Sequence, residues 1–199
     1  AGGATRVAKN LGVAPRADVA AIVAKANADT AVLRNQVIGT QLNDITRDLA
    51  RLHESEMGNM VTDAMREKYP GIDAAFTNSG GLRQNLVFAP PSAGEQPGEI
   101  TWGEMFAVLP FGNRTTILTL TGAQIKTAFL NGFSAFCNPA INTGRFPQIA
   151  GLKVQFHCTG ALPAQTPVLD GVWKAPNGPA RCGPMRFCMS AMTLRMNHT

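Results

Sequence analysis

The sequence of 199 residues contains no long apolar run, and none of its apolar stretches approaches the length of about 20 residues that a membrane helix needs. The first residues, AGGATRVAKN, lack the apolar core of a signal peptide, so any export signal is expected to have been removed or to lie elsewhere. The net charge is +5, yet the basic residues are scattered, and no basic run is interleaved with aromatic residues. We therefore expect no transmembrane segment and no nucleic-acid partner.

Cysteine is also scarce, since the chain has four cysteines and no CxxC spacing. A structural zinc site is therefore not expected. The even number fits disulfide bonds formed in an oxidising compartment, and it fits free, buried cysteines equally well.

With 45% hydrophobic and 16% charged residues, the composition is that of one globular domain with a full core. Residues 1–34 are rich in alanine and have apolar residues at helical spacing, which predicts a connecting helix. The segment HESEMGNMVTDAMREKY predicts a second helix, with Ser55 as its N-cap and methionines on its buried face. An apolar run from Ile72 to Phe76 then predicts a buried strand.

The middle of the chain carries clear start and stop signals. Thr101-x-x-Glu104 and Thr121-x-x-Gln124 are capping boxes that each predict the start of a helix, with the strand TTILTL between them. Asn131-Gly132 predicts the end of the second of these helices. Residues 151–158 alternate between apolar and polar, as a half-buried strand does, and Asp170-Gly171 predicts a turn. Helices and strands mix without a regular βαβ period, so we predict an α/β (α+β) fold with a mixed sheet and helices packed on it.

The stretch FTNSGGLRQNL is the strongest candidate for a binding site. Its strand ends in Asn78, Ser79 and two glycines, which offer backbone N–H groups that no Cβ shields from a ligand. Arg83 follows with a planar, permanently charged group that suits phosphate or carboxylate. The pattern predicts an anion or phosphate-ester site, and the competing interpretation is a tight turn followed by a surface arginine.

The stretch LPFGN is a second candidate. Phe111 lies between a proline and a glycine, where the chain must turn. Its ring is either packed in the core or offered as a flat surface on which a nucleobase can stack. The two outcomes are similar in energy, because stacking contributes about 1–3 kcal/mol per base.

Five motifs together carry a resemblance to a known family. The segments ESEMGNMVTDAMR, NSGGLR, ITWGEMFAVLPFGN, LTGAQIKTAFLNG and GRFPQIAGLKVQF occur in this order from about Asn35 to about Gly178. In sequence and spacing they resemble the C-terminal domain of 5'-nucleotidases, a family that includes secreted and periplasmic nucleotidases and ecto-5'-nucleotidase. The resemblance divides the chain into an interdomain helix region at 1–34, the substrate-binding domain at 35–179 and an atypical Met-rich tail at 180–199.

The resemblance implies a division of labour between two domains. An N-terminal metallophosphatase domain holds two divalent metals and hydrolyses the phosphate ester, while the C-terminal domain holds the nucleotide or nucleoside. By analogy, Arg51, Asn78, Gly81 and Arg83 are expected to hold the substrate, and Phe111 is expected to stack on the base. The expected partners are thus a nucleotide or nucleoside and the N-terminal domain, and the expected location is secreted, periplasmic or otherwise extracellular.

The sequence departs from the family in the metal-binding half. It has no Asp-x-His or Gly-Asn-His motif, and its three histidines are scattered. A two-metal site needs a dense set of ligands, so we expect no metal cofactor in this chain and no hydrolysis by the chain alone. Two alternatives stay open: a non-catalytic secreted nucleotide- or anion-binding protein, and an interaction domain with an incomplete site.

The last twenty residues depart as well. The family closes with an Asn-Phe segment and a Gly-Gly-Asp-Gly turn, which supply a second aromatic ring and an acid for the ribose. Here four methionines at helical spacing (Met185, Met189, Met192 and Met196) predict an amphipathic helix, with a disordered tail as the alternative. From the even cysteine count and the secreted relatives, we also predict a disulfide between Cys137 and Cys158.

Overall fold

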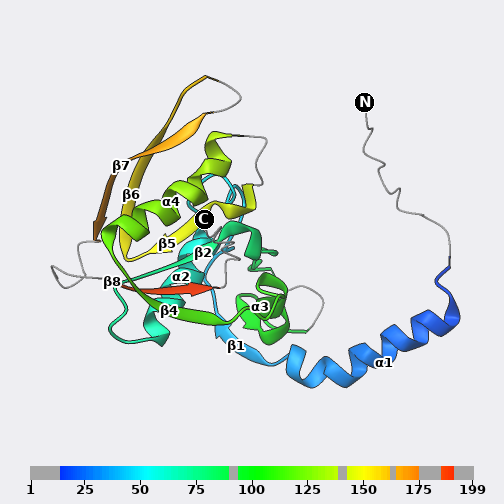
Figure 1. Cartoon of the computed structure of the whole chain (residues 1–199). Coiled ribbons are helices and arrows are strands. Elements are labelled where there is room, and N and C mark those ends of the chain that lie inside the picture. Colours follow the sequence, from blue (N-terminus) through cyan, green and yellow to red (C-terminus); the bar gives the residue numbers. More distant parts are fainter. Residues whose placement is uncertain (1–13, 90–93, 139–142, 162–164, 175–184, 191–199) are drawn as a thin grey trace, which may run out of the picture.

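The computed structural model describes residues 14–89, 94–138, 143–161, 165–174 and 185–190 (Figure 1). In chain order its elements are α1 (Ala17–Arg34), β1 (Val37–Thr40), α2 (Glu56–Lys68), β2 (Ala74–Asn78), the 3-10 turn η1 (Ser79–Gly81), β3 (Glu99–Thr101), α3 (Trp102–Val108), β4 (Thr115–Leu120), α4 (Gly122–Cys137), the 3-10 turn η2 (Thr143–Arg145), β5 (Pro147–Ala150), β6 (Leu152–Thr159), β7 (Thr166–Lys174) and β8 (Met185–Ser190).

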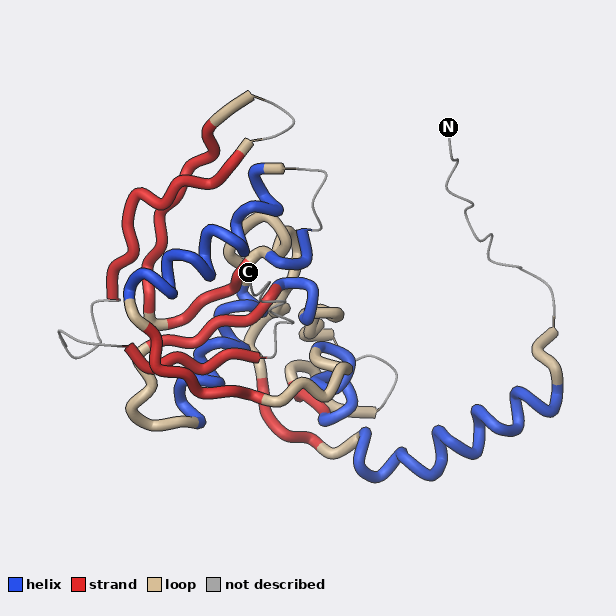
Figure 2. Tube along the Cα trace, in the orientation of Figure 1, coloured by secondary structure: helices blue, strands red, loops and turns tan. Residues whose placement is uncertain are grey.

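The central sheet has four strands in the order β4-β8-β2-β5 and is mixed, as the sequence predicts. Strand β2 runs parallel to β8 and antiparallel to β5, while β8 runs antiparallel to β4. Because side chains alternate along a strand, Ala74 and Phe76 of β2 pack with α4, whereas Ala75 packs with the C-terminal part of α2. The sheet is therefore covered on both faces (Figure 2).

The predicted helix starts are confirmed. Both capping boxes form: Thr101 with Glu104, and Thr121 with Gln124. Ser55 caps α2, because its side chain accepts a hydrogen bond from the backbone N–H of Gly58 at 3.0 Å. These side chains satisfy N–H groups that the first turn of a helix leaves without a partner.

Helix α4 does not end at Asn131-Gly132, so this prediction was wrong. The helix continues to Cys137. Gly132 is instead a packing residue, since a Cβ at this position would lie 3.0 Å from Cδ of Pro147 on β5. The glycine lets the helix approach the sheet closely, and that gain in packing outweighs its low helix propensity.

The hairpin of β6 and β7 extends the fold beside α4 (Figure 1). The predicted alternation in β6 is confirmed, because its half-buried and exposed side chains alternate from Leu152 to Thr159. The turn predicted at Asp170-Gly171 is wrong: β7 runs through both residues, and Asp170 is the extra residue of a β-bulge between the pairs Gln155–Gly171 and Phe156–Leu169. The predicted disulfide is confirmed, since Cys137 at the end of α4 is bonded to Cys158 of β6.

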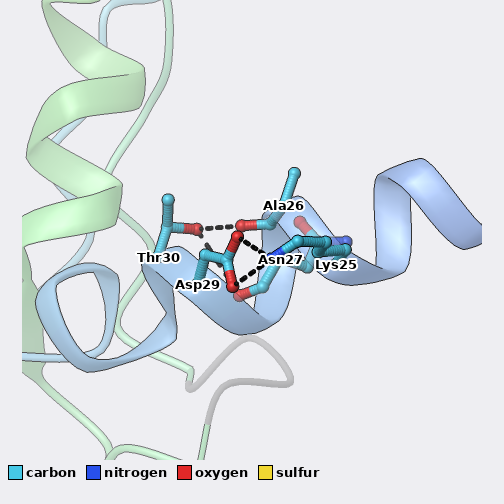
Figure 3. Close-up of polar contacts among 5 residues, drawn as sticks. All are labelled: Lys25, Ala26, Asn27, Asp29 and Thr30. Carbon is cyan, nitrogen blue, oxygen red and sulfur yellow. Dashed lines mark hydrogen bonds and ion pairs between the residues drawn. The ribbon is translucent and has the colours of Figure 1, made fainter.

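Helix α1 extends away from the body of the fold (Figure 1) and buries none of its residues. Its polar side chains make contacts within the helix itself. Examples are the ion pair of Lys25 and Asp29 at 2.8 Å and the hydrogen bond from Thr30 Oγ1 to the carbonyl of Ala26 (Figure 3). Apolar side chains such as Ile22 and Val32 are exposed alongside these contacts. None of the helices in the described ranges is long and apolar enough to cross a membrane.

The prediction for the Met-rich tail was wrong over 185–190. This segment is neither a helix nor disordered; it is strand β8, which lies between β4 and β2. In β8 the backbone N–H and C=O groups form hydrogen bonds with a strand on each side, and this pairing outweighs the helical spacing of the methionines. Met192 and Met196 lie outside the described residues.

Candidate functional site

The candidate site lies where the parallel strands β2 and β8 end. Met189 pairs with Phe76 of β2, and Ser190 pairs with Thr115 of β4. The end of β8 therefore lies beside η1, which follows β2, and beside the turn that precedes β4. Ligands of α/β folds commonly bind outside the carboxyl ends of strands, where loops diverge.

The two glycines of the NSGG turn have different roles. A Cβ at Gly80 would lie 3.0 Å from the carbonyl oxygen of Gly144, so Gly80 is needed for packing against η2. The Asn78 side chain strengthens this contact by donating a hydrogen bond to the same oxygen at 3.2 Å. Gly81 is buried but less constrained, since a Cβ there would meet only Asn78 Oδ1, at 3.7 Å. Packing thus explains one glycine, and the other lines the cavity described below.

Arg83 joins the NSGG turn to the LPFGN turn. Its backbone N–H donates to the carbonyl of Val108 at 2.9 Å, at the end of α3. Its exposed guanidinium donates to the carbonyl of Gly80 at 3.3 Å, and Cζ lies 5.7 Å from the centre of the Phe111 ring. A cation over an aromatic ring at this distance is attracted to the ring face.

Phe111 is exposed to 59% of its surface, so it is not a core residue. The preceding helix ends in Val108, and Gly112 has a φ of 60°, which turns the chain back into β4. Phe111, Gly81 and Asn113 line a cavity of about 500 Å³. Its other walls are mostly apolar residues of β1, α2, β3 and α3.

Arg51 lies on a different loop, between β1 and α2, and is half-buried. Among the described residues it makes no hydrogen bond, ion pair or ring contact with the other four predicted site residues. The loops are nevertheless neighbours: Ile45 pairs with Leu86, and the Asn85 side chain accepts a hydrogen bond from the backbone of Arg47 at 2.8 Å. The structure thus brings Asn78, Gly81, Arg83 and Phe111 together and places Arg51 on the adjoining loop.

Two further candidates are not among the residues predicted from the sequence. Asn113 lines the same cavity as Phe111. Arg47 has a buried Nε with no hydrogen-bond partner in the part of the chain that the structure describes. Their positions in the sequence could have indicated both residues, since Asn113 is the last residue of the LPFGN stretch and Arg47 precedes Arg51 by four residues.

No cluster of three or more His, Cys, Asp or Glu side chains suited to a metal ion occurs within the described ranges. The polar groups at the candidate site are instead arginines and the side chains of Asn78 and Asn113. Such a set can bind an anion and a flat ring.

Comparison with known proteins identifies the family. The sequence profile described as "5'-nucleotidase, C-terminal domain" matches residues 23–166. The cell wall protein Lmo0130 of Listeria monocytogenes is 35% identical over 161 residues, which are 75% of this chain and 19% of that protein. The trifunctional nucleotide phosphoesterase protein YfkN of Bacillus subtilis is 39% identical over 116 residues, which are 57% of this chain and 7% of that protein.

A solved structure agrees with these matches. The 5'-nucleotidase precursor from Thermus thermophilus has a TM-score of 0.67 and 31% identity, covering 88% of this chain and 34% of that chain. The chain therefore spans about a third of this structure and about a fifth or less of the two curated relatives. With a profile match over more than half of its length, the chain belongs to the 5'-nucleotidase C-terminal domain family.

Proposed function

We propose that this chain holds the base and the phosphate of a nucleotide for a 5'-nucleotidase-type phosphohydrolase. The observation that carries this proposal is the pairing of Arg83 with Phe111: a guanidinium lies 5.7 Å from the centre of an aromatic ring that is 59% exposed. A group that binds phosphate and a ring that stacks on a base are the two parts that nucleotide recognition requires.

The phosphate side of the site is built from Arg83 and the turn before it. Arg83 is exposed and makes a hydrogen bond to the Gly80 carbonyl at 3.3 Å, which is longer than a strong charge-assisted bond. A phosphate would provide a stronger acceptor than this carbonyl. Arg51 and Arg47, on the adjoining loop, are proposed to add positive charge on the same side.

The base side of the site is built from Phe111 and its neighbours. Its exposed ring lies at a turn whose backbone is fixed by the end of α3 and by Gly112. Asn113 offers both a donor and an acceptor beside the ring, as the edge of a nucleobase requires. Asn78 and Gly81 complete the contact surface on the side of η1.

Hydrolysis itself is proposed to take place on an N-terminal metallophosphatase domain outside this sequence. Two divalent metals held by that domain would activate the attacking water and stabilise the charge on phosphate. Helix α1, whose apolar side chains are exposed, is proposed as the connection to that domain. The disulfide and a cell wall relative are consistent with a secreted or periplasmic location.

Calorimetric titration with AMP tests the proposal. We expect Arg83→Ala to weaken AMP binding by about ten- to hundredfold, because a hydrogen bond to a charged group contributes about 1.5–3 kcal/mol. Arg83→Lys should recover only part of the loss, because an ammonium group cannot reproduce the planar fork. Arg16→Ala is the matched control: it removes the same charge at the exposed start of α1 and should leave AMP affinity unchanged.

Two outcomes would contradict the proposal. If the wild-type chain binds no AMP, the site is incomplete and the interaction-domain alternative is favoured. If Arg83→Ala and Arg16→Ala reduce AMP affinity equally, the effect is one of net charge and the assigned phosphate site is wrong.

A further inference from the structure

Gln148 of β5 is one of the most deeply buried polar side chains among the described residues, with 1% of its surface exposed. Its carboxamide is fully used. Oε1 accepts hydrogen bonds from the backbone N–H and the hydroxyl of Ser55, at 2.9 and 3.2 Å. Nε2 donates to the carbonyls of Ala50 and His53, both at 2.7 Å. All four bonds reach one segment, more than ninety residues away in the sequence.

This segment is the loop that carries Arg51. The two carbonyls that Gln148 binds flank the arginine, one residue before it and two residues after it. The loop also contains Leu49, whose φ of 60° is the only positive φ of a non-glycine residue in the described ranges. This left-handed backbone conformation is unfavourable for leucine, so it persists only where surrounding contacts hold the chain in place.

The packing around Gln148 leaves it little freedom to move. A Cβ on Gly58 of α2 would overlap the Gln148 carboxamide, so the helix lies directly against it. On its other side, Gln148 pairs with Thr77 in the sheet, and its neighbour Pro147 pairs with Asn78. Gln148 thus links the Arg51 loop to the strand that ends in the candidate site.

We propose that Gln148 is a positioning residue for substrate binding: it fixes the backbone on both sides of Arg51 so that the guanidinium faces the phosphate side of the site. This role rests on the proposed function and extends it, because Gln148 itself contacts no ligand. A buried amide with four satisfied hydrogen bonds rigidifies what it holds, and loss of these bonds would free the loop.

A double-mutant cycle with AMP titration tests this role. Gln148→Leu removes all four bonds at similar volume and should weaken AMP binding by about ten- to hundredfold, the effect expected for losing the Arg51 contact. In the Arg51→Ala background the same substitution should cost less than about twofold more, because the group it positions is gone. In the Arg83→Ala background the two losses should multiply, because Arg83 is held by other contacts.

Two further variants separate positioning from stability. Thr62→Val is the destabilised control: it removes a buried hydroxyl that bonds only to carbonyls of its own helix, and it should lower the melting temperature without changing AMP affinity. If Gln148→Leu does not fold, Gln148→Glu keeps the acceptor for Ser55 and removes at least one of the two N–H donors to the loop, so the same cycle applies.

The outcomes distinguish this inference from the proposed function. A wild-type chain that binds no AMP overturns both. If AMP binds and Gln148→Leu weakens it by the same factor with and without the Arg51 side chain, Gln148 is only a structural residue, while the Arg83–Phe111 site stands. The same conclusion follows if Arg51→Ala leaves AMP affinity unchanged.

Discussion

Replacing Phe111 with alanine separates a binding role from a structural one. Complete burial of a large apolar side chain contributes about 1.5–3 kcal/mol, and Phe111 is 59% exposed, so its packing contributes about 1 kcal/mol. The contact with Arg83 adds about 0.5–1 kcal/mol at an exposed site. We therefore expect Phe111→Ala to lower the free energy of unfolding by about 1–2 kcal/mol.

The effect on ligand binding should be distinct. Stacking of one base on one aromatic ring contributes about 1–3 kcal/mol, and a ring on only one side of the base provides about half of that. Phe111→Ala should therefore weaken AMP and adenosine binding alike, by about two- to tenfold, because the base is common to both.

Urea denaturation and calorimetry of the same variant provide the two measurements. Phe129→Ala is the matched control: Phe129 is 1% exposed, so its loss should cost about 3–5 kcal/mol of stability. If Phe111→Ala costs as much as Phe129→Ala, Phe111 belongs to the core in solution. If its stability loss is small and AMP affinity is unchanged, Phe111 is not the stacking ring.

The remaining predictions concern catalysis, the disulfide and the arginine. The chain alone should release no phosphate from AMP with or without added divalent metal, since its sequence has no dense set of metal ligands; metal-dependent release above a purified blank would refute this. Reduction of the Cys137–Cys158 bond should lower stability by about 3 kcal/mol and the melting temperature by about 6–12 °C, whereas an unchanged melt would show that the bond does not stabilise the fold. Arg83→Ala should leave adenosine affinity unchanged or raise it; a loss equal to that for AMP would show that Arg83 contacts the nucleoside.

Features with a local physical cause could be predicted from the sequence. The cap at Ser55 and both capping boxes depend on residues three positions apart, and all of them form. The alternation in β6 reflects one buried face, which a period of two reveals directly. The NSGGLR and LPFGN stretches were predicted as site residues, and the structure brings Arg83 and Phe111 into contact.

Features that depend on distant partners could not be predicted in this way. The pair Asn131-Gly132 is typical of a helix end, but here Gly132 allows close packing against Pro147 and the helix continues past it. The spacing of the tail methionines predicts a helix, whereas residues 185–190 form strand β8 between β4 and β2. The hydrogen bonds of Gln148 could not be predicted for the same reason, since their partners lie more than ninety residues away in the sequence.

Arg83 links the phosphate side of the proposed site to the base side, because it contacts both the NSGG turn and the Phe111 ring. The guanidinium lies over one face of the Phe111 ring, so a base that stacks on that face would compete with Arg83. Moving Arg83 away costs about 0.5–1 kcal/mol of cation–π contact. A nucleotide offsets this cost, because its phosphate offers the guanidinium a contact of about 1.5–3 kcal/mol.

A nucleoside offers no such compensation, so in the proposed site it would displace Arg83 without replacing the lost contact. Phosphate binding and base binding would therefore be coupled through one side chain, and the coupling would favour nucleotide over nucleoside beyond the phosphate contact alone. This is why Arg83→Ala has different expected effects on the two ligands: AMP loses its phosphate contact, while adenosine no longer has to displace the guanidinium from the ring. The change in AMP affinity thus measures the phosphate contact, and the change in adenosine affinity measures the cost of moving the Arg83 guanidinium off the Phe111 ring.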